Sequence, residues 1–355
     1  MTADEQVSKG DETGDAAVER MVAAVDEGWR VGEAIAIDDG GNETVAVTVE
    51  TDNGVRECVL KATDEEDGGG NLAAEAKLLR LLGAETSVPV PEVYGVVDDH
   101  PDLPTPLFLM ERIDGKALPT DASAVPDEEM VAYVRQVGRS LGEVHGLDAF
   151  DGYGPVVDAE RVDPADVGGA RLLAREYGLA LDDPHDTWAS RLPATAEWML
   201  DRLESTRFGD LVPELREAID RRRPGLDLSG TPVIARIDHH PGNLAVDRES
   251  RTVTGLLDWG LARTTHPEYE LVCAEQGFCG TDSFDSERRE RIRTALYEGY
   301  DETAELPSAD GFAERRRLHR LVFLASNMTW VSRWVTPNIE DKVERDYREF
   351  VAELL

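Results

Sequence analysis

The chain has 355 residues and a formal net charge of −36, because 73 acidic residues stand against 37 basic ones. The acids are spread along the whole chain, and no basic patch offers a surface for nucleic acid or for an anionic membrane. With 41% hydrophobic residues, the chain is long enough for two lobes with ample core, which argues against disorder.

Lysine is rare, because only five of the 37 basic residues are lysine and the rest are arginine. An acid-coated, lysine-poor surface suits molar salt, where the Debye length shrinks to about 3 Å and repulsion between like charges is screened. The composition therefore predicts a halophilic protein, as in halophilic archaea, that loses stability at low salt.

The cysteines and the N-terminus bear on the compartment. Cys58, Cys273 and Cys279 form no CxxC pair, and their odd number suits a reducing cytosol without a disulfide framework. The N-terminus lacks the basic region and apolar run of a signal peptide, and no apolar run reaches transmembrane length. We expect a cytoplasmic protein, and its oligomeric state does not follow from the sequence.

The first elements read as a helix and two strands. In chain order we expect a loose acidic tail over 1–16, a helix over 17–31, and strands over 33–37 and 44–50. The turn between the strands contains Gly40, Gly41 and Asn42, and glycine there allows positive φ and close approach of the backbone to a ligand. The alternative is an ordinary hairpin turn.

The next strand and helix carry two charged residues of interest. Alternation along the strand from Val55 places Val59 and Lys61 on one face, and Lys61 remains lysine in a chain that otherwise uses arginine. A glycine-rich segment that we expect to be flexible leads to a helix over 72–82, whose apolar stripe includes Glu75. A carboxylate on such a stripe needs a cation, and Lys61 is the candidate; the alternatives are a chance lysine and an acid at the stripe's edge.

The rest of the chain reads as two more strands and then mostly helices. Strands are expected from Val88 and over 107–110, which completes a five-stranded antiparallel sheet between about residues 17 and 110. Helices are expected over 127–147, 170–181, 187–208, 214–223, 286–300 and 311–355. The fold class is therefore α+β.

The most informative stretch is 233–271. Asp238 follows a short apolar run, Asn243 lies five residues later, and two strands joined by a polar turn end at Asp258-Trp259-Gly260. Phosphoryl transfer needs one carboxylate to meet the acceptor hydroxyl, and an amide oxygen with a second carboxylate to hold Mg²⁺ against the phosphates. The hairpin returns Asp258 to the end of the sheet that carries Asn243. The alternative is two acidic turns around a hairpin in an acid-rich chain.

This stretch resembles the aminoglycoside phosphotransferase and choline kinase family, small-molecule kinases with a protein-kinase-like fold. The family signature is roughly His-Gly-Asp-x-His-Pro-Gly-Asn, a hairpin, and Ile-Asp-Trp. The positions that match are Asp238, His240, Pro241, Gly242, Asn243, Asp258 and Trp259. Arg236 and Ile237 stand where the signature has His and Gly.

The resemblance implies a two-lobe protein-kinase-like fold. After the tail, residues 17–112 would form the nucleotide-binding N-lobe, and residues 113–355 the C-lobe with the catalytic loop and the substrate site. The implied activity is transfer of the γ-phosphate of ATP or GTP to a hydroxyl group of a metabolite or an aminoglycoside-like substrate. The implied partners are a nucleotide with Mg²⁺ and a small hydroxylated molecule, with no nucleic acid and no membrane.

The resemblance also implies roles for individual residues. Asp238 would accept the substrate proton, and Asn243 and Asp258 would bind Mg²⁺. The nucleotide would be held by a larger set: Lys61 and Glu75 at the phosphates, Val59 over the adenine, the backbone of Glu111 and Ile113 at its edge, and the Gly40, Gly41 and Asn42 turn over the phosphates. We expect Arg236 to pair with Asp258 and brace the site rather than to pair with Asp238.

Two features of the sequence are compatible with other functions. Asp238-His239-His240 resembles the Asp-His-His motif of phosphoesterases that use two Mn²⁺ ions, but that family needs further metal ligands upstream on a parallel sheet. A nucleotide-binding pseudokinase is suggested by Arg236 and Ile237. The retention of Asp238, Asn243, Asp258 and Lys61 argues against a catalytically dead site.

Overall fold

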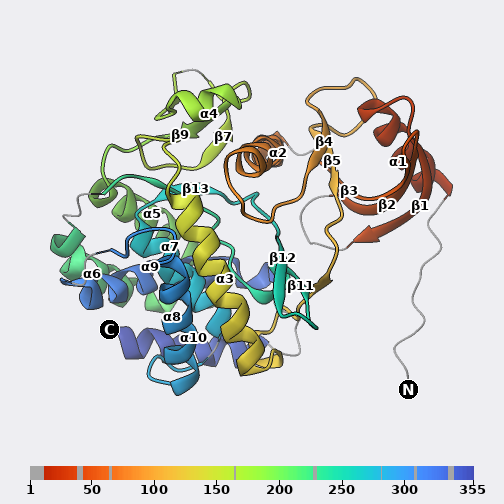
Figure 1. Ribbon diagram of the computed structural model, residues 1–355. Helices are drawn as coiled ribbons and strands as arrows, with labels where there is room; N and C mark the ends of the chain where they lie inside the picture. The colour runs from red at the N-terminus through yellow and green to blue at the C-terminus, as the bar shows by residue number, and fades with distance from the viewer. Residues whose placement is uncertain are drawn as a thin grey trace.

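The computed structural model describes residues 12–37, 43–63, 66–163, 165–226, 230–280, 282–307, 310–334 and 340–355. Figure 1 shows a small lobe built on a sheet near the N-terminus and a larger, mostly helical lobe that contains the C-terminus. The predicted α+β class is confirmed.

The small lobe is built on one five-stranded sheet in the order β1-β2-β3-β5-β4. Each neighbouring pair is antiparallel, as the sequence predicted. The elements of this part are α1 (Glu12–Val25), β1 (Arg30–Ile37), β2 (Glu43–Thr51), β3 (Gly54–Ala62), α2 (Glu66–Glu85), β4 (Val93–Val97) and β5 (Leu107–Glu111).

The first helix begins and ends earlier than predicted. It starts at Glu12, inside the stretch expected to be loose, and it ends at Val25 rather than at residue 31. Acidic and alanine residues favour the first turns of a helix, which accounts for the early start. The Asp26 side chain accepts a hydrogen bond from the Gly28 backbone at 2.8 Å, and this turn ends the helix and leads into β1.

Helix α2 is longer than the predicted helix over 72–82. The backbone of Gly68–Gly70, which was expected to be flexible, is helical. Glycine disfavours a helix interior by roughly 1 kcal/mol relative to alanine, but burial of the apolar face that follows outweighs local propensity. That face contributes Leu72, Leu78, Leu79, Leu81 and Leu82 to the core.

The large lobe holds most of the helices. Its elements are β6 (Lys116–Ala117), α3 (Asp127–His145), β7 (Val156–Asp158), β8 (Val167–Gly168), α4 (Leu172–Glu176), β9 (Leu179–Asp182), α5 (Trp188–Leu203), α6 (Val212–Arg222), β10 (Val233–Ala235), β11 (Leu244–Asp247), β12 (Thr252–Leu256), β13 (Arg263–Thr265), α7 (Pro267–Cys279), α8 (Glu287–Tyr300), α9 (Phe312–Trp334) and α10 (Glu340–Leu354). None of the helices described is long and apolar enough to cross a bilayer.

The prediction of one helix over 170–181 is wrong. Short helix α4 stops at Glu176, Gly178 takes a positive φ of 71°, and the chain continues as strand β9. Strand β9 lies between β7 and β8 in a three-stranded sheet that the sequence analysis missed. Helix α7 was also missed, and its side chains are almost all buried.

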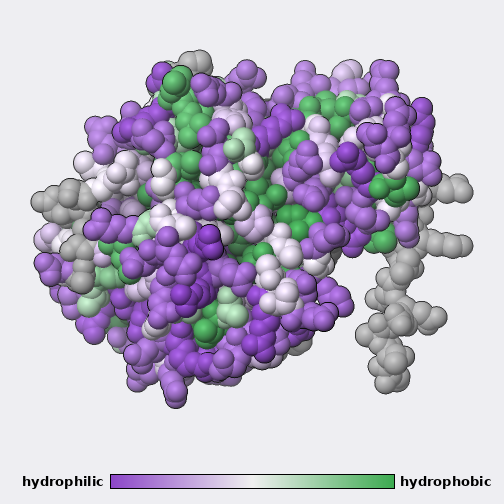
Figure 2. All heavy atoms as spheres, viewed as in Figure 1, coloured by the Kyte–Doolittle hydropathy of each residue, from purple (hydrophilic) through white to green (hydrophobic). Residues whose placement is uncertain are grey.

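Three apolar cores support the two lobes. One lies between α1 and the small sheet, a second joins α2 to α3, β7 and β9, and a third joins α5, α6, α9 and α10. Figure 2 shows a mostly hydrophilic outer surface, with many of the apolar residues visible on this face gathered between the lobes.

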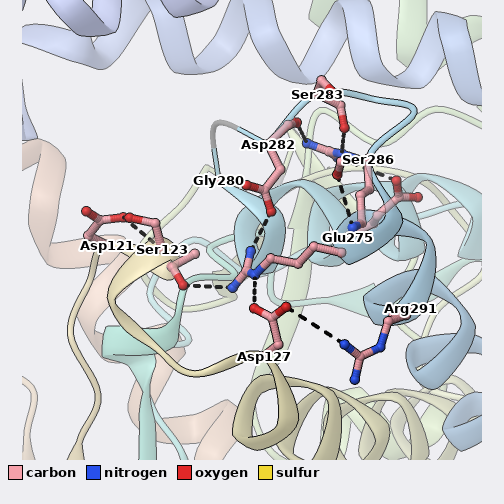
Figure 3. Close-up of polar contacts among 12 residues, drawn as sticks. Asp121, Ser123, Asp127, Glu275, Gly280, Asp282, Ser283, Ser286 and Arg291 are labelled. Carbon is pink, nitrogen blue, oxygen red and sulfur yellow. Dashed lines mark hydrogen bonds and ion pairs between the residues drawn. The ribbon is translucent and has the colours of Figure 1, made fainter.

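A polar network fixes the start of α3 against α8 (Figure 3). Asp127 accepts one hydrogen bond from Nε of Arg288, at 2.8 Å, and its carboxylate lies 3.8 Å from the guanidinium of Arg291. Arg288 also binds the Asp282 carboxylate and the carbonyl of Ala122. The segment before α3 is therefore tied to the turn between α7 and α8.

Candidate active site

The predicted hairpin is present and brings its two ends together. Strands β11 and β12 pair with Leu244 opposite Leu256. At the open end, the Leu257 N–H donates to the carbonyl of Asn243 at 3.0 Å. Trp259 is buried, and its indole N–H donates to the Leu256 carbonyl at 3.1 Å. Asn243 and Asp258 therefore lie on neighbouring strand ends.

Asp238 and Asn243 are joined directly. The side-chain nitrogen of Asn243 donates to Oδ2 of Asp238 at 3.1 Å and to its carbonyl oxygen at 3.2 Å. These bonds orient the amide, so that its oxygen is left to bind a cation. Nε2 of His240 lies 3.7 Å from Oδ2 of Asp238. The Asp238 carboxylate is partly exposed, as a group that meets a substrate must be.

Lys61 and Glu75 form the predicted contact. Nζ of Lys61 donates to the two carboxylate oxygens of Glu75 at 2.9 and 3.1 Å, and both side chains are buried. Burial raises the pKa of the Glu75 carboxyl, and the charge of Lys61 acts in the opposite direction. Nζ also lies 4.0 Å from Oδ1 of Asp258, whose side chain is 47% exposed. One buried ammonium is thus shared between a buried and an open carboxylate.

Arg236 does not make the predicted pair with Asp258. Its guanidinium is buried, and one nitrogen, Nη1, donates to the carbonyls of Leu257 at 2.7 Å and Asn243 at 3.2 Å. Within the part of the chain that is described, it forms no ion pair with Asp238 or Asp258. The side chain reaches the base of the hairpin, where two carbonyl oxygens converge, rather than the open carboxylate.

A buried chain of polar contacts continues from Arg236. Its Nη2 donates to Nδ1 of His239 at 3.0 Å, and Nε2 of His239 donates to Oε1 of Glu270 at 2.6 Å. The same oxygen of Glu270 accepts the backbone N–H groups of Arg236, at 2.8 Å, and Ile237, at 3.4 Å. Burial lowers the pKa of His239, which favours the neutral ring that these two contacts require.

The sequence analysis missed Glu270. Burial would raise the pKa of its carboxyl, but the contacts with His239 and with the backbone hold it below its ordinary value. A signal for it was present, because it follows the helix-starting Pro267 by three residues inside an apolar segment. A carboxylate at such a position needs buried donors, which the loop at 236–239 supplies.

Backbone geometry explains why the family signature has glycine at the second position. Ile237 has a φ of 71°, in the left-handed region that glycine adopts without strain and a β-branched residue rarely does. Asp258 also has a positive φ, of 58°. On the other side of the loop, a Cβ on Gly277 of α7 would overlap with the carbonyl oxygen of His239. The loop is therefore strained and closely packed.

The residues expected to meet the nucleotide are placed as follows. Val59 and Lys61 share one face of β3; Val59 packs against the core that contains α2, while neighbours Cys58 and Leu60 pack against α1. The Glu111 N–H donates to the carbonyl of Glu92 at 2.8 Å. The side chain of Ile113 lies against Gly255. Gly40, Gly41 and Asn42 lie outside the described residues.

The geometry does not favour the phosphoesterase alternative. The upstream sheet is antiparallel, whereas that class requires ligands on a parallel sheet. Asp238 and His240 do approach each other, but His239 is committed to buried contacts with Arg236 and Glu270.

The small antiparallel sheet, the helical lobe and the hairpin site between them define a kinase-like phosphotransferase. More specifically, the chain belongs to the phosphotransferase enzyme family known as APH, whose model matches residues 34–312. The description of this family makes the chain a phosphotransferase.

Solved structures of aminoglycoside phosphotransferases have a fold similar to that of this chain. The GDP complex of aminoglycoside 2'-phosphotransferase-IIIa is 16% identical, has a TM-score of 0.62, and is matched over 96% of this chain and 99% of that one. A ternary complex of a thermostable mutant of aminoglycoside phosphotransferase APH(4)-Ia with AMP-PNP and hygromycin B is 14% identical, with a TM-score of 0.61 and coverage of 95% and 96%. The predicted kinase-like two-lobe fold is confirmed.

A curated relative is much longer than this chain. The protein described as "Probable acyl-CoA dehydrogenase IBR3" of Arabidopsis thaliana is 26% identical over 192 residues. The match covers 53% of this chain and 20% of that protein. The chain therefore spans about a fifth of the relative it matches.

Proposed function

We propose that this enzyme transfers the γ-phosphate of ATP or GTP to a hydroxyl group of a small molecule. The observation that carries the proposal is the position of the Lys61 ammonium, 2.9 Å from Glu75 and 4.0 Å from Asp258. Asn243 and Asp238 lie on the adjoining strand end. A cation, a metal-binding pair and a base are thus grouped as phosphoryl transfer requires.

Asp238 is the proposed base. Its carboxylate is partly exposed and is held by Asn243. Phosphoryl transfer of this type depends mostly on positioning and electrostatics, so a well-placed Asp238 carboxylate can accept or orient the hydroxyl proton. The carboxylate keeps its second oxygen for the substrate, because only Oδ2 is bonded to Asn243.

Asn243 and Asp258 are the proposed Mg²⁺ ligands. The donor set fits this ion, since Mg²⁺ prefers oxygen ligands and is commonly held by one or two protein groups together with phosphate oxygens. The Asn243 amide is turned so that its oxygen is free, and the Asp258 carboxylate is open to solvent. When bound, the ion would neutralise charge on the phosphates.

The nucleotide would lie between the two lobes, which we propose comprise residues 17–112 and 113–355. Lys61, oriented by Glu75, would bind the phosphates, and Val59 would cover the adenine. Ile113 supports a backbone contact with the adenine edge, because it forms no hydrogen bond within the described residues. The proposed roles of the backbone of Glu111 and of the turn Gly40, Gly41 and Asn42 rest on the family resemblance alone.

The acceptor is proposed only as a class, a small hydroxylated metabolite or an aminoglycoside-like molecule. Hygromycin B and AMP-PNP are bound together in one structure of similar fold, and GDP is bound in another. The acid-rich composition supports an enzyme of a salt-rich cytoplasm.

A pseudokinase is the second candidate, because Arg236 and Ile237 depart from the family signature. The contacts of Arg236 favour an active site instead. Its guanidinium joins the carbonyls of Asn243 and Leu257, so it holds the two proposed metal-binding positions together.

A screen of hydroxylated compounds with ATP and with GTP, in molar KCl with Mg²⁺, tests the proposal. Asp258→Asn should keep the fold but lose transfer and weaken Mg²⁺-nucleotide binding measured by calorimetry. Lys61→Ala should lose most of kcat, while Lys342→Ala, which removes an exposed lysine, serves as the control. Nucleotide binding without transfer to any acceptor or to water would favour the pseudokinase.

A further inference from the structure

Helix α2, which carries Glu75, packs into a core that extends over both lobes. Its leucines cluster with Val156, Val157, Leu179 and Ala180 of β7 and β9 on one side, and with Phe108 and Met110 of β5 on the other. The core under the five-stranded sheet is a separate cluster, formed by α1, β2, β3 and β5. Figure 1 shows α2 between β7 and strands β4 and β5. The helix therefore contacts both lobes, and β7 and β9 are its contacts in the large lobe.

A buried ion pair fastens α2 to that lobe. Nζ of Lys77 lies 2.6 Å from Oδ1 of Asp158, and the two side chains are 15% and 1% exposed. Asp158 ends strand β7, and the same Oδ1 accepts the backbone N–H of Glu160 at 3.0 Å. Lys61 is buried and Lys77 is partly buried, and they are the least exposed lysines among the described residues of a chain that prefers arginine.

The pair sits close to Glu75 but on the other side of the helix. Residues two positions apart on a helix point in nearly opposite directions, so Lys77 faces β7 while Glu75 faces the cleft. There Oε1 of Glu75 meets Nζ of Lys61 and lies 3.4 Å from the backbone nitrogen of Trp259. Glu75 thus touches both the sheet that carries Lys61 and the loop that carries Asp258.

We propose that Lys77 and Asp158 form a positioning pair that holds α2 on the large lobe, so that Glu75 stays fixed beside Asp258. The five-stranded sheet then closes onto a Glu75 that is already in place, and Lys61 is oriented when the lobes meet. Neither residue touches the nucleotide, and the pair acts through Glu75. This inference rests on the proposed function, since the roles of Lys61 and Glu75 belong to it.

A purely structural pair would also be buried, so the test compares kinetics rather than stability alone. Lys77→Met removes the ammonium with little change in volume, and Asp158→Asn removes the charge without changing shape. The matched control is Arg315→Met, because Arg315 and Glu268 form a similarly buried pair, 11% and 1% exposed, between α9 and α7. All variants are compared at equal folded fraction in molar KCl.

Release of phosphate from Mg²⁺-ATP, with water or a screened compound as acceptor, gives kcat and the nucleotide KM. We expect both Lys77→Met and Asp158→Asn to lower kcat about tenfold, roughly 1.4 kcal/mol in the barrier, and Arg315→Met to change it less than twofold. Equal losses of activity in Arg315→Met and in the two variants would show that Lys77 and Asp158 have only a structural role, and would overturn the proposal.

The decisive measurement combines Lys77→Met with Glu75→Gln. If Lys77 acts through Glu75, the double variant is no slower than Glu75→Gln alone. Additive losses overturn the proposal, as does the failure of both Lys77→Met and Asp158→Asn to fold. A wild-type enzyme that neither binds nor cleaves a nucleotide would instead refute the proposed function, so the two failures are distinguishable.

Discussion

The guanidinium of Arg236 donates to the carbonyl oxygen of Leu257 at 2.7 Å, across the base of the hairpin. Leu257 directly precedes Asp258, and the same nitrogen of Arg236 also binds the carbonyl of Asn243. A residue that departs from the family signature therefore supports the two strand ends proposed to bind Mg²⁺. It does so through backbone atoms, without an ion pair to either acidic residue of the loop.

Replacing Arg236 tests this support. Arg236→Met leaves the carbonyl oxygen of Leu257 and a ring nitrogen of His239 without their donor, and the Asn243 carbonyl keeps only the Leu257 N–H. The change should destabilise the fold by about 2–4 kcal/mol and lower kcat at least tenfold. Arg236→His restores the family residue, and its activity should lie within about tenfold of wild type, or roughly 1.4 kcal/mol in the barrier. Thermal melting and steady-state kinetics measure both effects.

A matched control exists at Arg222, which also donates to carbonyl oxygens, those of Ala218 at 3.1 Å and Leu354 at 2.9 Å. Arg222→Met should lower stability but leave kcat unchanged. A gain of a hundredfold or more in Arg236→His would show that arginine suppresses the base, and would favour the pseudokinase.

The positive φ of Ile237 predicts that glycine at this position is more stabilising than alanine, the reverse of their usual order. Glycine usually destabilises more than alanine, but at a φ of 71° alanine keeps the strain and glycine removes it. Ile237→Gly should therefore be more stable than Ile237→Ala by about 1 kcal/mol in chemical unfolding. At the buried helical position Ile219 the usual order should hold. Equal stability of the two Ile237 variants would mean that the strain is absent in solution.

Buried histidines predict a dependence of stability on pH. Burial lowers the pKa of five of the seven histidines, to about 4 for His145 and His266, and in direction for His239, His240 and His319. Because the folded pKa is below the unfolded value of about 6.5, the unfolded chain binds more protons as the pH falls. Stability should be fully present above about pH 6.5 and decrease toward pH 4.

His266 offers a way to check the source of this slope. Its Nδ1 accepts the backbone N–H of Glu268 at the start of α7, and asparagine is also a good N-cap that does not titrate in this range. His266→Asn should reduce the loss of unfolding free energy between pH 7 and 4 by on the order of 2 kcal/mol, and the melting temperature should then depend less steeply on pH. An unchanged slope in molar KCl would assign the effect to other groups.

The charge of −36 predicts a requirement for salt. Below roughly 0.5 M salt the screening length exceeds about 4 Å, so neighbouring surface carboxylates begin to repel one another. The melting temperature should fall sharply on transfer from about 3 M to about 0.1 M KCl. Sucrose in place of the salt should not restore it, and identical melting curves in the two salt solutions would contradict the prediction.

Local patterns predicted much of the fold and the central contacts of the candidate site. The alternation of β3 placed Val59 and Lys61 together, and the helical stripe of α2 placed a carboxylate opposite Lys61, as the 2.9 Å contact confirms. The hairpin between Asn243 and Asp258 also followed from alternation and a polar turn. These features depend on residues close in sequence, where a periodic pattern is informative.

Features that depend on distant partners were not predictable. The target of Arg236 is a carbonyl 21 residues away, and the partner of His239 is Glu270, 31 residues away. A sequence pattern identifies neither. Strands β7 and β9 of the three-stranded sheet are short. Gly178, which separates α4 from β9, lies in a sequence whose pattern resembles that of one continuous helix. Packing rather than propensity determines these elements.

The position of α2 also bears on how the molecule unfolds. The chain completes β3, crosses to dock α2 on the large lobe, and returns to add β4 and β5 to the sheet. Unfolding of either lobe would disturb α2, because α2 is joined in sequence to β3 and β4 of the small sheet and packs against the large lobe. The two lobes therefore form one cooperative unit, and a single transition should describe the melting of both.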